Sequence, residues 1–276
     1  MNKPKVSILM ATYNNANYVT EAIQSILDQT FNDWEFIIVN DGSTDSTLET
    51  IKQIAKEDNR IIILNNESNS GVIKSLNKGL KVAKGEYVAK IDGDDVWTHR
   101  EKLEKQVDFL ENNLNYSLVG TWSRIVDRER KHLENMTGPS SDEDIRKIIL
   151  KYNCFNHSSI VIRKSTLDKV GYYDENRNLC EDYELWLRIG KVAKIFNIPE
   201  FWVDYRVNPN SITQTKFDEC DVDMNAIKDQ YQNDYNLSMW DKIIERARRY
   251  YPLWFKHLTY KLKRRTAIII FKVAKK

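Results

Sequence analysis

Strand-like and helix-like segments alternate along the first 113 residues, and this alternation constrains the fold more than any other feature. Continuous apolar runs such as VSILMATYN predict strands buried on both faces, and these runs lie at 6–14, 34–43, 60–66 and 86–92. Each is followed by apolar residues at helical spacing, at 17–30, 43–57, 69–85 and 99–113. Strand and helix alternating through short loops predict right-handed crossovers and an α/β fold with a mostly parallel sheet flanked by helices.

Polar clusters follow three of these predicted strands. They are TYNN at 12–15, NDGS at 40–43 and DGDD at 92–95. In open parallel sheets, ligands bind at the carboxyl ends of the strands, where the strand order reverses. The three clusters therefore predict one binding rim.

The cluster at 92–95 places Asp92, Asp94 and Asp95 within four positions. Like charges at this spacing raise one another's pKa, so their grouping needs a reason. One interpretation is a solvated turn that caps the next helix, since Asp favours turns and Gly tolerates positive φ. The other is a Mg²⁺ or Mn²⁺ site, because these cations take carboxylate oxygens together with substrate phosphates. The motif alone leaves both open.

The alternation ends after about residue 115. Strand-like segments are expected at 116–127 and 157–165, and a loop and helix at 137–153. A loop-to-helix segment is expected at 172–193 and a strand-to-loop segment at 198–213. A break in the pattern suits a region that adapts to a second substrate.

A basic segment ends the chain. Residues 246–276 hold 11 Lys and Arg and no Asp or Glu, whereas residues 1–245 carry a net charge of −9. Trp254 and Phe255 lie on one face of the predicted helix there. This pattern predicts a membrane-surface helix attracted to anionic lipid, and the alternative is a helix docked on the domain with a solvated basic face.

Composition indicates a soluble globular protein, with 41% hydrophobic and 30% charged residues among 276. The three cysteines form no CxxC pair, which argues against a disulfide framework or a zinc site and fits a reducing compartment. The N-terminal residues lack the apolar core of a signal peptide, and no stretch reaches the roughly 18 apolar residues of a membrane span. We expect a cytoplasmic protein, peripheral on the inner face of the cytoplasmic membrane if the basic segment binds lipid.

Three long stretches carry a family resemblance. VSILMATYNNANYVTEAIQSILDQTFNDWEFIIVNDGSTDST, NSGVIKSLNKGLKVAKGEYVAKIDGDD and CEDYELWLRI resemble the inverting family 2 glycosyltransferases of the GT-A fold, over roughly residues 4 to 213. That family moves a sugar from a nucleotide-diphosphate donor to an acceptor hydroxyl, and its DxD motif carries the metal that bridges the diphosphate. The resemblance implies a nucleotide-sugar, typically a UDP-sugar, with Mg²⁺ or Mn²⁺. It also implies an acceptor in surface polysaccharide or lipid-linked oligosaccharide synthesis.

The resemblance also implies a division of the chain. Residues 1–215 would form the GT-A domain, with a nucleotide-binding half at 1–115 and an acceptor-side half at 116–215. Residues 216–276 would form a helical basic extension.

Nucleotide-binding residues carry over position by position from the family. They are Thr12, Tyr13, Asn15, Asp41 and Lys74. Thr12, Tyr13 and Asn15 would line the base and ribose, Asp41 would accept a hydrogen bond from uracil N3–H, and Lys74 would neutralise a phosphate. Ordinary loop packing for Tyr13 and a solvated helix face for Lys74 are the alternatives.

The metal ligands and the base carry over in the same way. Asp94 would bind the metal directly, Asp92 would contact the ribose or the metal, and Asp95 would be a lesser ligand or a helix cap. Asp182 of the ED motif would accept the proton of the attacking hydroxyl, and Glu181 would orient the acceptor or the helix. The alternative for both is an acidic charge that complements the helix dipole.

Two further positions bear on the site. His157 falls on the family's strand that walls the acceptor site, where it contacts a sugar or is structural. Asn208 stands where many relatives carry a histidine that serves as a third metal ligand, so a histidine-completed metal site is not expected.

Two other functions compete with glycosyl transfer. A nucleotidyltransferase shares the α/β scaffold, but it would need a Gly-rich loop after the first strand, and ATYNNANY contains no Gly. A membrane- or nucleic-acid-binding module would act through residues 246–276 alone and would leave the Asp-rich rim without a role. We expect no nucleic-acid partner.

Overall fold

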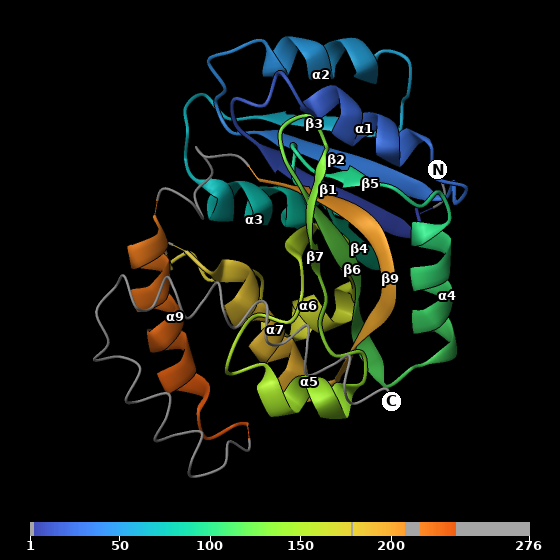
Figure 1. Cartoon of the computed structure of the whole chain (residues 1–276). Helices are drawn as coiled ribbons and strands as arrows, with labels where there is room; N and C mark the ends of the chain where they lie inside the picture. The colour runs from blue at the N-terminus through green and yellow to red at the C-terminus, as the bar shows by residue number, and fades with distance from the viewer. Residues whose placement is uncertain (1–2, 178, 208–215, 236–276) are drawn as a thin grey trace.

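The computed structural model describes residues 3–177, 179–207 and 216–235. A nine-stranded sheet runs through the molecule in the order β3-β2-β1-β4-β8-β6-β9-β5, with β7 paired to β6. Helices cover both faces of this sheet (Figure 1). Within these ranges no helix is long and apolar enough to cross a membrane.

The first half of the chain builds the parallel part of the sheet. Its strands are β1 (Val6–Thr12), β2 (Trp34–Asn40), β3 (Ile61–Asn65) and β4 (Tyr87–Lys90). Its helices are α1 (Val19–Leu27), α2 (Thr47–Ala55) and α3 (Val72–Val82). Strand β1 pairs in parallel with β2 and β4, and β2 pairs in parallel with β3. The predicted strand–helix alternation is confirmed.

Strand β1 shows why these strands consist of continuous apolar residues. Ile8 and Met10 pack into the cluster formed with α1, α2 and α4, whereas Leu9 and Ala11 pack into the cluster on the α3 side. Side chains alternate between the two faces of a strand, so a strand covered on both faces needs an apolar residue at nearly every position. Figure 1 shows α1 and α2 on one side of the sheet and α3 on the other.

The second half extends the sheet with mixed pairing. Its strands are β5 (Val96–Trp97), β6 (Tyr116–Val126), β7 (His132–Met136), β8 (Val161–Arg163) and β9 (Lys194–Arg206). Strand β8 runs antiparallel to both β4 and β6, and β6 runs parallel to the long, curved β9. The all-parallel pairing of the first half therefore ends at β4, and the pairing beyond β4 is mixed.

Within the described residues, this half holds five helices and one short 3₁₀ turn. They are α4 (Lys102–Asn112), α5 (Asp142–Ile148), η1 (His157–Ser159), α6 (Lys164–Val170), α7 (Glu181–Val192) and α9 (Phe217–Tyr231). Helix α9 packs against α7. The helices predicted within 137–153 and 172–193 are confirmed as α5 and α7.

Three local predictions were wrong. The strand predicted at 157–165 is the turn η1, the three-residue strand β8 and the start of α6. Strands β5 and β7 were not predicted, because β5 has two residues and β7 is a largely exposed polar edge strand. Asp95 does not cap the next helix, since β5 intervenes and α4 begins after Glu101 with no side-chain cap. The predictions for Asn208 and for residues 246–276 lie outside the described residues.

Candidate active site

The DGDD loop lies directly against the end of β1. A Cβ atom on Gly93 would stand 2.5 Å from Thr12 Oγ1 and 3.0 Å from Asn15 Nδ2, so only glycine fits there. Asn15 Nδ2 donates to Thr12 Oγ1 at 3.0 Å. Two of the predicted polar clusters are therefore in contact.

Asp95 anchors this loop from inside. It is buried, the Ser158 hydroxyl donates to its Oδ2 at 2.5 Å, and the Arg206 backbone N–H donates to its Oδ1 at 2.9 Å. Arg206 Nε also donates to the Asp94 carbonyl at 2.9 Å. Burial is the main cause that raises the pKa of Asp95 well above its usual range, and the negative charges of Asp94 and Asp92 raise it further. Both oxygens of Asp95 thus hold the loop to β9 and to η1.

Asp92 is paired with a lysine from the strand that precedes it. Lys90 Nζ lies 2.5 Å from Asp92 Oδ1, and the lysine side chain is 1% exposed whereas that of Asp92 is 33% exposed. Burial, the largest influence, acts to raise the pKa of Asp92, but the Lys90 ammonium together with smaller contributions holds the pKa below its usual value. Asp92 is therefore a charge-compensated carboxylate that is open to the outside.

Asp94 differs from both neighbours, because its carboxylate has no hydrogen bond or ion pair to a side chain in the described ranges. Asp94 is half-buried. Burial is the main cause that raises its pKa to about 6, and the negative charge of Asp92 is the second cause. Carboxylate oxygens are the ligands that Mg²⁺ and Mn²⁺ prefer, and a cation would relieve this repulsion. The residues present therefore fit such a cation. No group of three or more His, Cys, Asp or Glu side chains converges on a metal position in the described residues.

The ED motif forms the first turn of α7. Asn153 Nδ2 donates to Asp182 Oδ2 at 2.8 Å, and the Tyr183 backbone N–H donates to Asp182 Oδ1 at 2.6 Å. Burial raises the pKa of Asp182, and burial together with the charge of Asp182 raises the pKa of Glu181 to about 7. The charges of Lys90 and Asp92 act on both pKa values, so the DGDD and ED motifs lie within electrostatic reach of each other.

His157 lies between the two motifs. Its Nε2 is 2.7 Å from the Tyr173 hydroxyl, its Nδ1 is 4.0 Å from Glu181 Oε1, and its ring packs edge-on against Trp186. Burial lowers the pKa of His157 well below its usual value, so the imidazole is neutral near pH 7. The ring is therefore neutral and hydrogen-bonded, and it packs between Tyr173 and Trp186 beside Glu181.

The remaining predicted nucleotide residues occupy the rim. The Asp41 carboxylate accepts hydrogen bonds from Asn66 Nδ2, the Ser70 backbone N–H and hydroxyl, and the Gly71 backbone N–H, at 2.7–2.9 Å. Burial acts to raise the pKa of Asp41, but these donors hold it below its usual value. Tyr13 is 43% exposed, and Lys74 is exposed on α3. Asp41 thus fixes the loop that leads into α3, while Tyr13 and Lys74 project outward.

Comparison with known families settles what kind of protein carries this site. The model of Glycosyl transferase family 2 matches residues 7–171, more than half of the chain. The chain belongs to this family.

Named relatives agree with this assignment. The chain is 38% identical over 222 residues to the putative glycosyltransferase EpsE of Bacillus subtilis, which covers 78% of this chain and 77% of that protein. It is 32% identical to the putative teichuronic acid biosynthesis glycosyltransferase TuaG of the same organism, over 78% of this chain and 84% of TuaG. It is 36% identical to the uncharacterised glycosyltransferase MJ1057 of Methanocaldococcus jannaschii, over 76% of this chain and 73% of that protein.

Solved structures show the same fold. S. aureus TarS, solved with UDP, superposes with a TM-score of 0.67 at 23% identity, over 85% of this chain and 67% of that one. The mannosyltransferase PcManGT of Pyrobaculum calidifontis, solved with GDP-Man and Mn²⁺, superposes with a TM-score of 0.66 at 18% identity, over 91% of this chain and 70% of that one. The family 2 glycosyltransferase described here therefore has the GT-A fold, as predicted.

Four polar residues that contact the predicted site residues were not predicted from the sequence. They are Lys90, Asn153, Ser158 and Arg206. Lys90 gave a usable signal, because a lysine inside an apolar strand, two positions before Asp92, is a charged residue that needs a partner when buried. The other three reach the site through tertiary contacts that no local pattern reveals.

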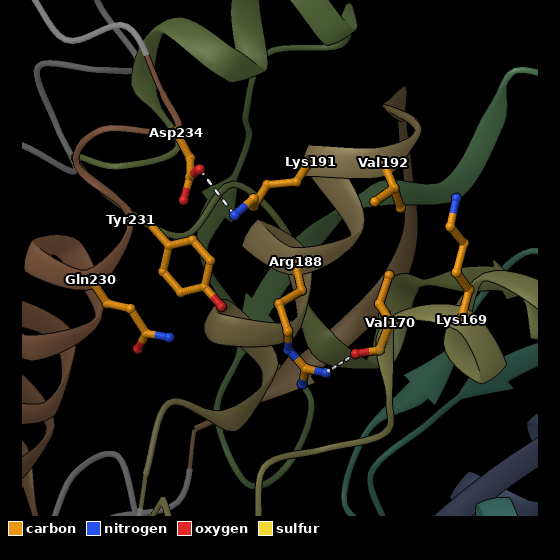
Figure 2. Close-up of a pocket in the computed structure, with 8 residues that line it drawn as sticks. All are labelled: Lys169, Val170, Arg188, Lys191, Val192, Gln230, Tyr231 and Asp234. Atoms are coloured by element: carbon orange, nitrogen blue, oxygen red, sulfur yellow. Dashed lines mark hydrogen bonds and ion pairs between the residues drawn. The ribbon is translucent and has the colours of Figure 1, made fainter.

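A hollow of about 390 Å³ lies elsewhere, between α6, α7 and α9. Figure 2 shows Lys191 paired with Asp234 across it and Arg188 bonded to the Val170 carbonyl, at 2.9 and 2.8 Å. Arg188 also pairs with Glu184. None of the residues that line this hollow belongs to the DGDD or ED motif, so the hollow is separate from the candidate site.

Proposed function

We propose that this family 2 glycosyltransferase transfers a sugar, with inversion, from a nucleotide-sugar to an acceptor hydroxyl in a metal-dependent reaction. A UDP-sugar is the proposed donor. One observation carries the proposal: the Asp94 carboxylate, which has no side-chain partner among the described residues, and the Glu181–Asp182 pair lie within electrostatic reach of the same Lys90–Asp92 ion pair. A cation-binding carboxylate beside a base is what this reaction needs.

The donor side of the proposal uses the rim of the parallel sheet. Asp94 would hold Mg²⁺ or Mn²⁺, with Asp92 beside it, and the bound cation would neutralise charge on the diphosphate. The proposed nucleotide contacts are Thr12, Tyr13, Asn15, Asp41 and Lys74. Contact between Thr12, Asn15 and the DGDD loop supports a nucleotide site that continues into the metal site.

The acceptor side uses the first turn of α7. The acceptor hydroxyl oxygen attacks the anomeric carbon, the bond to the diphosphate breaks with its electron pair, and Asp182 takes the hydroxyl proton. Attack on the face opposite the leaving group inverts the anomeric configuration. Asn153 and the Tyr183 N–H fix the Asp182 carboxylate, and each oxygen keeps a lone pair for the proton. Glu181 and His157 would orient the acceptor.

The acceptor class comes from the relatives. TuaG carries the name of a teichuronic acid biosynthesis enzyme, and its similarity extends over most of both chains. We therefore propose an acceptor in surface polysaccharide or lipid-linked oligosaccharide synthesis. In this proposal residues 1–115 bind the nucleotide and residues 116–215 bind the acceptor.

The basic segment at 246–276 would bring the enzyme to its acceptor. Each of its 11 basic residues near an anionic leaflet contributes about 1 kcal/mol of binding free energy, and the attraction weakens with salt. Deleting 246–276 should abolish co-sedimentation with phosphatidylglycerol vesicles and spare UDP binding. Failure of the full chain to bind these vesicles at low salt would remove the membrane from the proposal, leaving a cytoplasmic enzyme.

Donor screening tests the function directly. The full chain would be assayed with UDP-glucose, UDP-N-acetylglucosamine, UDP-galactose and GDP-mannose, each with Mn²⁺ or with EDTA, for thermal stabilisation and slow donor hydrolysis. A donor that binds the folded state raises the melting temperature by mass action. We expect stabilisation by a UDP-sugar with Mn²⁺ only, and hydrolysis that is lost in Asp182→Asn. Stabilisation by nucleoside triphosphates alone would favour a nucleotidyltransferase.

A further inference from the structure

Lys90 is a buried cation inside an acidic site. It is the last residue of β4, its side chain is 1% exposed, and its Nζ lies 2.5 Å from Asp92 Oδ1. It makes no other hydrogen bond within the described part of the chain. Because Lys90 and Asp92 are two positions apart at a strand end, the ammonium approaches the carboxylate from the sheet side, while the carboxylate remains one-third exposed.

The three aspartates of the loop are therefore compensated in different ways. Asp95 is buried and receives the Ser158 hydroxyl and the Arg206 N–H. Asp92 Oδ2 lies 3.2 Å from the same Ser158 oxygen, but the single hydroxyl proton is directed at Asp95 at the shorter distance, so Lys90 is the cation that compensates Asp92. Asp94 has no such partner in the described residues. One carboxylate, Asp94, is left to attract a cation.

One carboxylate is a weak site for Mg²⁺ or Mn²⁺, because these cations keep their waters unless further oxygen ligands replace them. Asp95 is buried with both oxygens bound, so Asp92 is the second ligand that the loop can offer. The Lys90 ammonium, however, competes for its oxygen and repels an incoming dication. The diphosphate of a donor brings the missing oxygens and negative charge. The site therefore offers a divalent cation enough oxygen ligands only when the diphosphate is bound as well.

We propose that Lys90 prevents the protein from taking up the divalent cation on its own, so that cation and nucleotide diphosphate bind together. The part of this inference that concerns the diphosphate rests on the proposed function. The part that concerns the metal alone does not. Lys90 is a positioning residue in this account: it acts through Asp92 and does not touch the substrate.

Lys90→Met removes the charge and keeps the length of the side chain. We expect the variant to bind Mn²⁺ without nucleotide at least about tenfold more tightly than the wild type, because Asp92 becomes free to act as a second ligand. Titration of Mn²⁺ followed by electron paramagnetic resonance measures this affinity without any substrate. Lys90→Arg keeps the charge and should bind Mn²⁺ as the wild type does.

A double variant isolates the Lys90–Asp92 pair. Lys90→Met with Asp92→Asn lacks both charges, so its Mn²⁺ affinity should return to within about threefold of the wild type. Circular dichroism and the melting temperature establish that each variant is folded. An unchanged Mn²⁺ affinity in folded Lys90→Met, or tight binding that persists in the double variant, overturns the proposal.

The wild type alone provides a second test that needs no variant at this position. Its Mn²⁺ affinity should rise at least about tenfold when UDP is added. Equal Mn²⁺ affinity with and without UDP overturns the proposal even if Lys90→Met does not fold. These results are independent of turnover: absence of sugar transfer would count against the proposed function and leave the effect of Lys90→Met on Mn²⁺ binding in place.

Discussion

Asp41 and Asp94 both follow strands of the parallel sheet, yet the chain treats them in opposite ways. Asp41 receives four hydrogen bonds from its own protein, and its pKa is held below the usual value. Asp94 receives no side-chain donor in the described ranges, and burial with the charge of Asp92 raises its pKa to about 6. The first carboxylate stabilises a loop, and the second is left for a ligand.

This contrast extends to the rest of the site. Asp95 resembles Asp41, because its oxygens are occupied by Ser158 and Arg206. Glu181 resembles Asp94, because burial and a neighbouring carboxylate raise its pKa to about 7. Carboxyls whose pKa is shifted by burial and a charged neighbour are candidates for a functional site. The hydrogen-bond donors that each carboxylate receives separate Asp41 and Asp95 from Asp94 and Glu181, whereas Asp182 receives two donors and is still the proposed base.

The largest expected effect is on turnover. Asp182→Asn keeps the shape of the side chain but cannot accept the acceptor proton, so the transfer rate should fall by about 10²–10⁴-fold while UDP-sugar affinity is retained. Transfer assays measure the rate, and calorimetry on the same preparation measures the UDP-sugar affinity. Near-normal turnover would move the base to Glu181.

On the structural side, Asp41→Ala should lower the free energy of unfolding by about 2–4 kcal/mol, because it removes four hydrogen bonds to a carboxylate and leaves the Ser70 N–H without its acceptor. Urea denaturation measures this loss. Asp108→Ala, at an exposed position on α4, is the matched control and should change stability by less than about 0.5 kcal/mol. Equal losses in both variants would mean that Asp41 does not hold its loop.

Glu181→Gln should stabilise the free protein above neutral pH. The ordinary pKa of a glutamate carboxyl is 4.5, and burial with the charge of Asp182 raises that of Glu181 to about 7 in the folded protein. The folded state therefore binds more protons than the unfolded chain between these values, and stability falls as pH rises through them. Glutamine cannot titrate, so above pH 7 the variant should be more stable by roughly 1–3 kcal/mol, and the gain should vanish below about pH 4.5.

Denaturation of wild type and variant at pH 4.5 and pH 8 measures this difference. Glu200→Gln, at an exposed position, is the control and should show no such gain. A Glu181→Gln gain that is equal at both pH values would show that the charge of Glu181 costs no stability.

The smallest effect is expected at Asn153. Asn153→Ala removes the donor to Asp182 Oδ2, so the pKa of Asp182 should rise further and the acid limb of the pH–rate profile should move to higher pH. Turnover at neutral pH should fall by about three- to tenfold with UDP-sugar affinity unchanged. A purely structural role for Asn153 predicts a loss of stability with no displacement of the profile.

Sequence patterns predicted the regular half of the molecule. The first four strands and three helices follow from apolar periodicity. The DGDD motif was noted because its aspartates are close in sequence, whereas the ED motif was predicted from the family resemblance. The expected contact of the β1 end with the loop at 92–95 is confirmed through Thr12, Asn15 and Gly93. These features depend on residues that are neighbours in the sequence or on the order of the strands in the sheet.

What sequence could not supply is the set of partners that gives each aspartate its role. Ser158 and Arg206 meet Asp95 from 63 and 111 positions away, and Asn153 meets Asp182 from 29 positions away. The prediction at 157–165 was one long strand, whereas β8 has only three residues between a 3₁₀ turn and a helix. Three residues are too few to show an alternation of apolar and polar side chains. Tertiary contacts, not local pattern, decided these cases.

Calorimetric titration of UDP into wild type and Asp94→Asn, each with Mn²⁺ and with EDTA, tests the central claim most directly. Asp94 is proposed to be the free carboxylate of the loop that joins cation to diphosphate, and Asp108→Asn serves as the control. Mn²⁺ should raise the UDP affinity of the wild type and of the control by at least about tenfold and should leave that of folded Asp94→Asn unchanged. An Asp94→Asn variant whose UDP affinity still rises with Mn²⁺ as in the wild type would contradict the account.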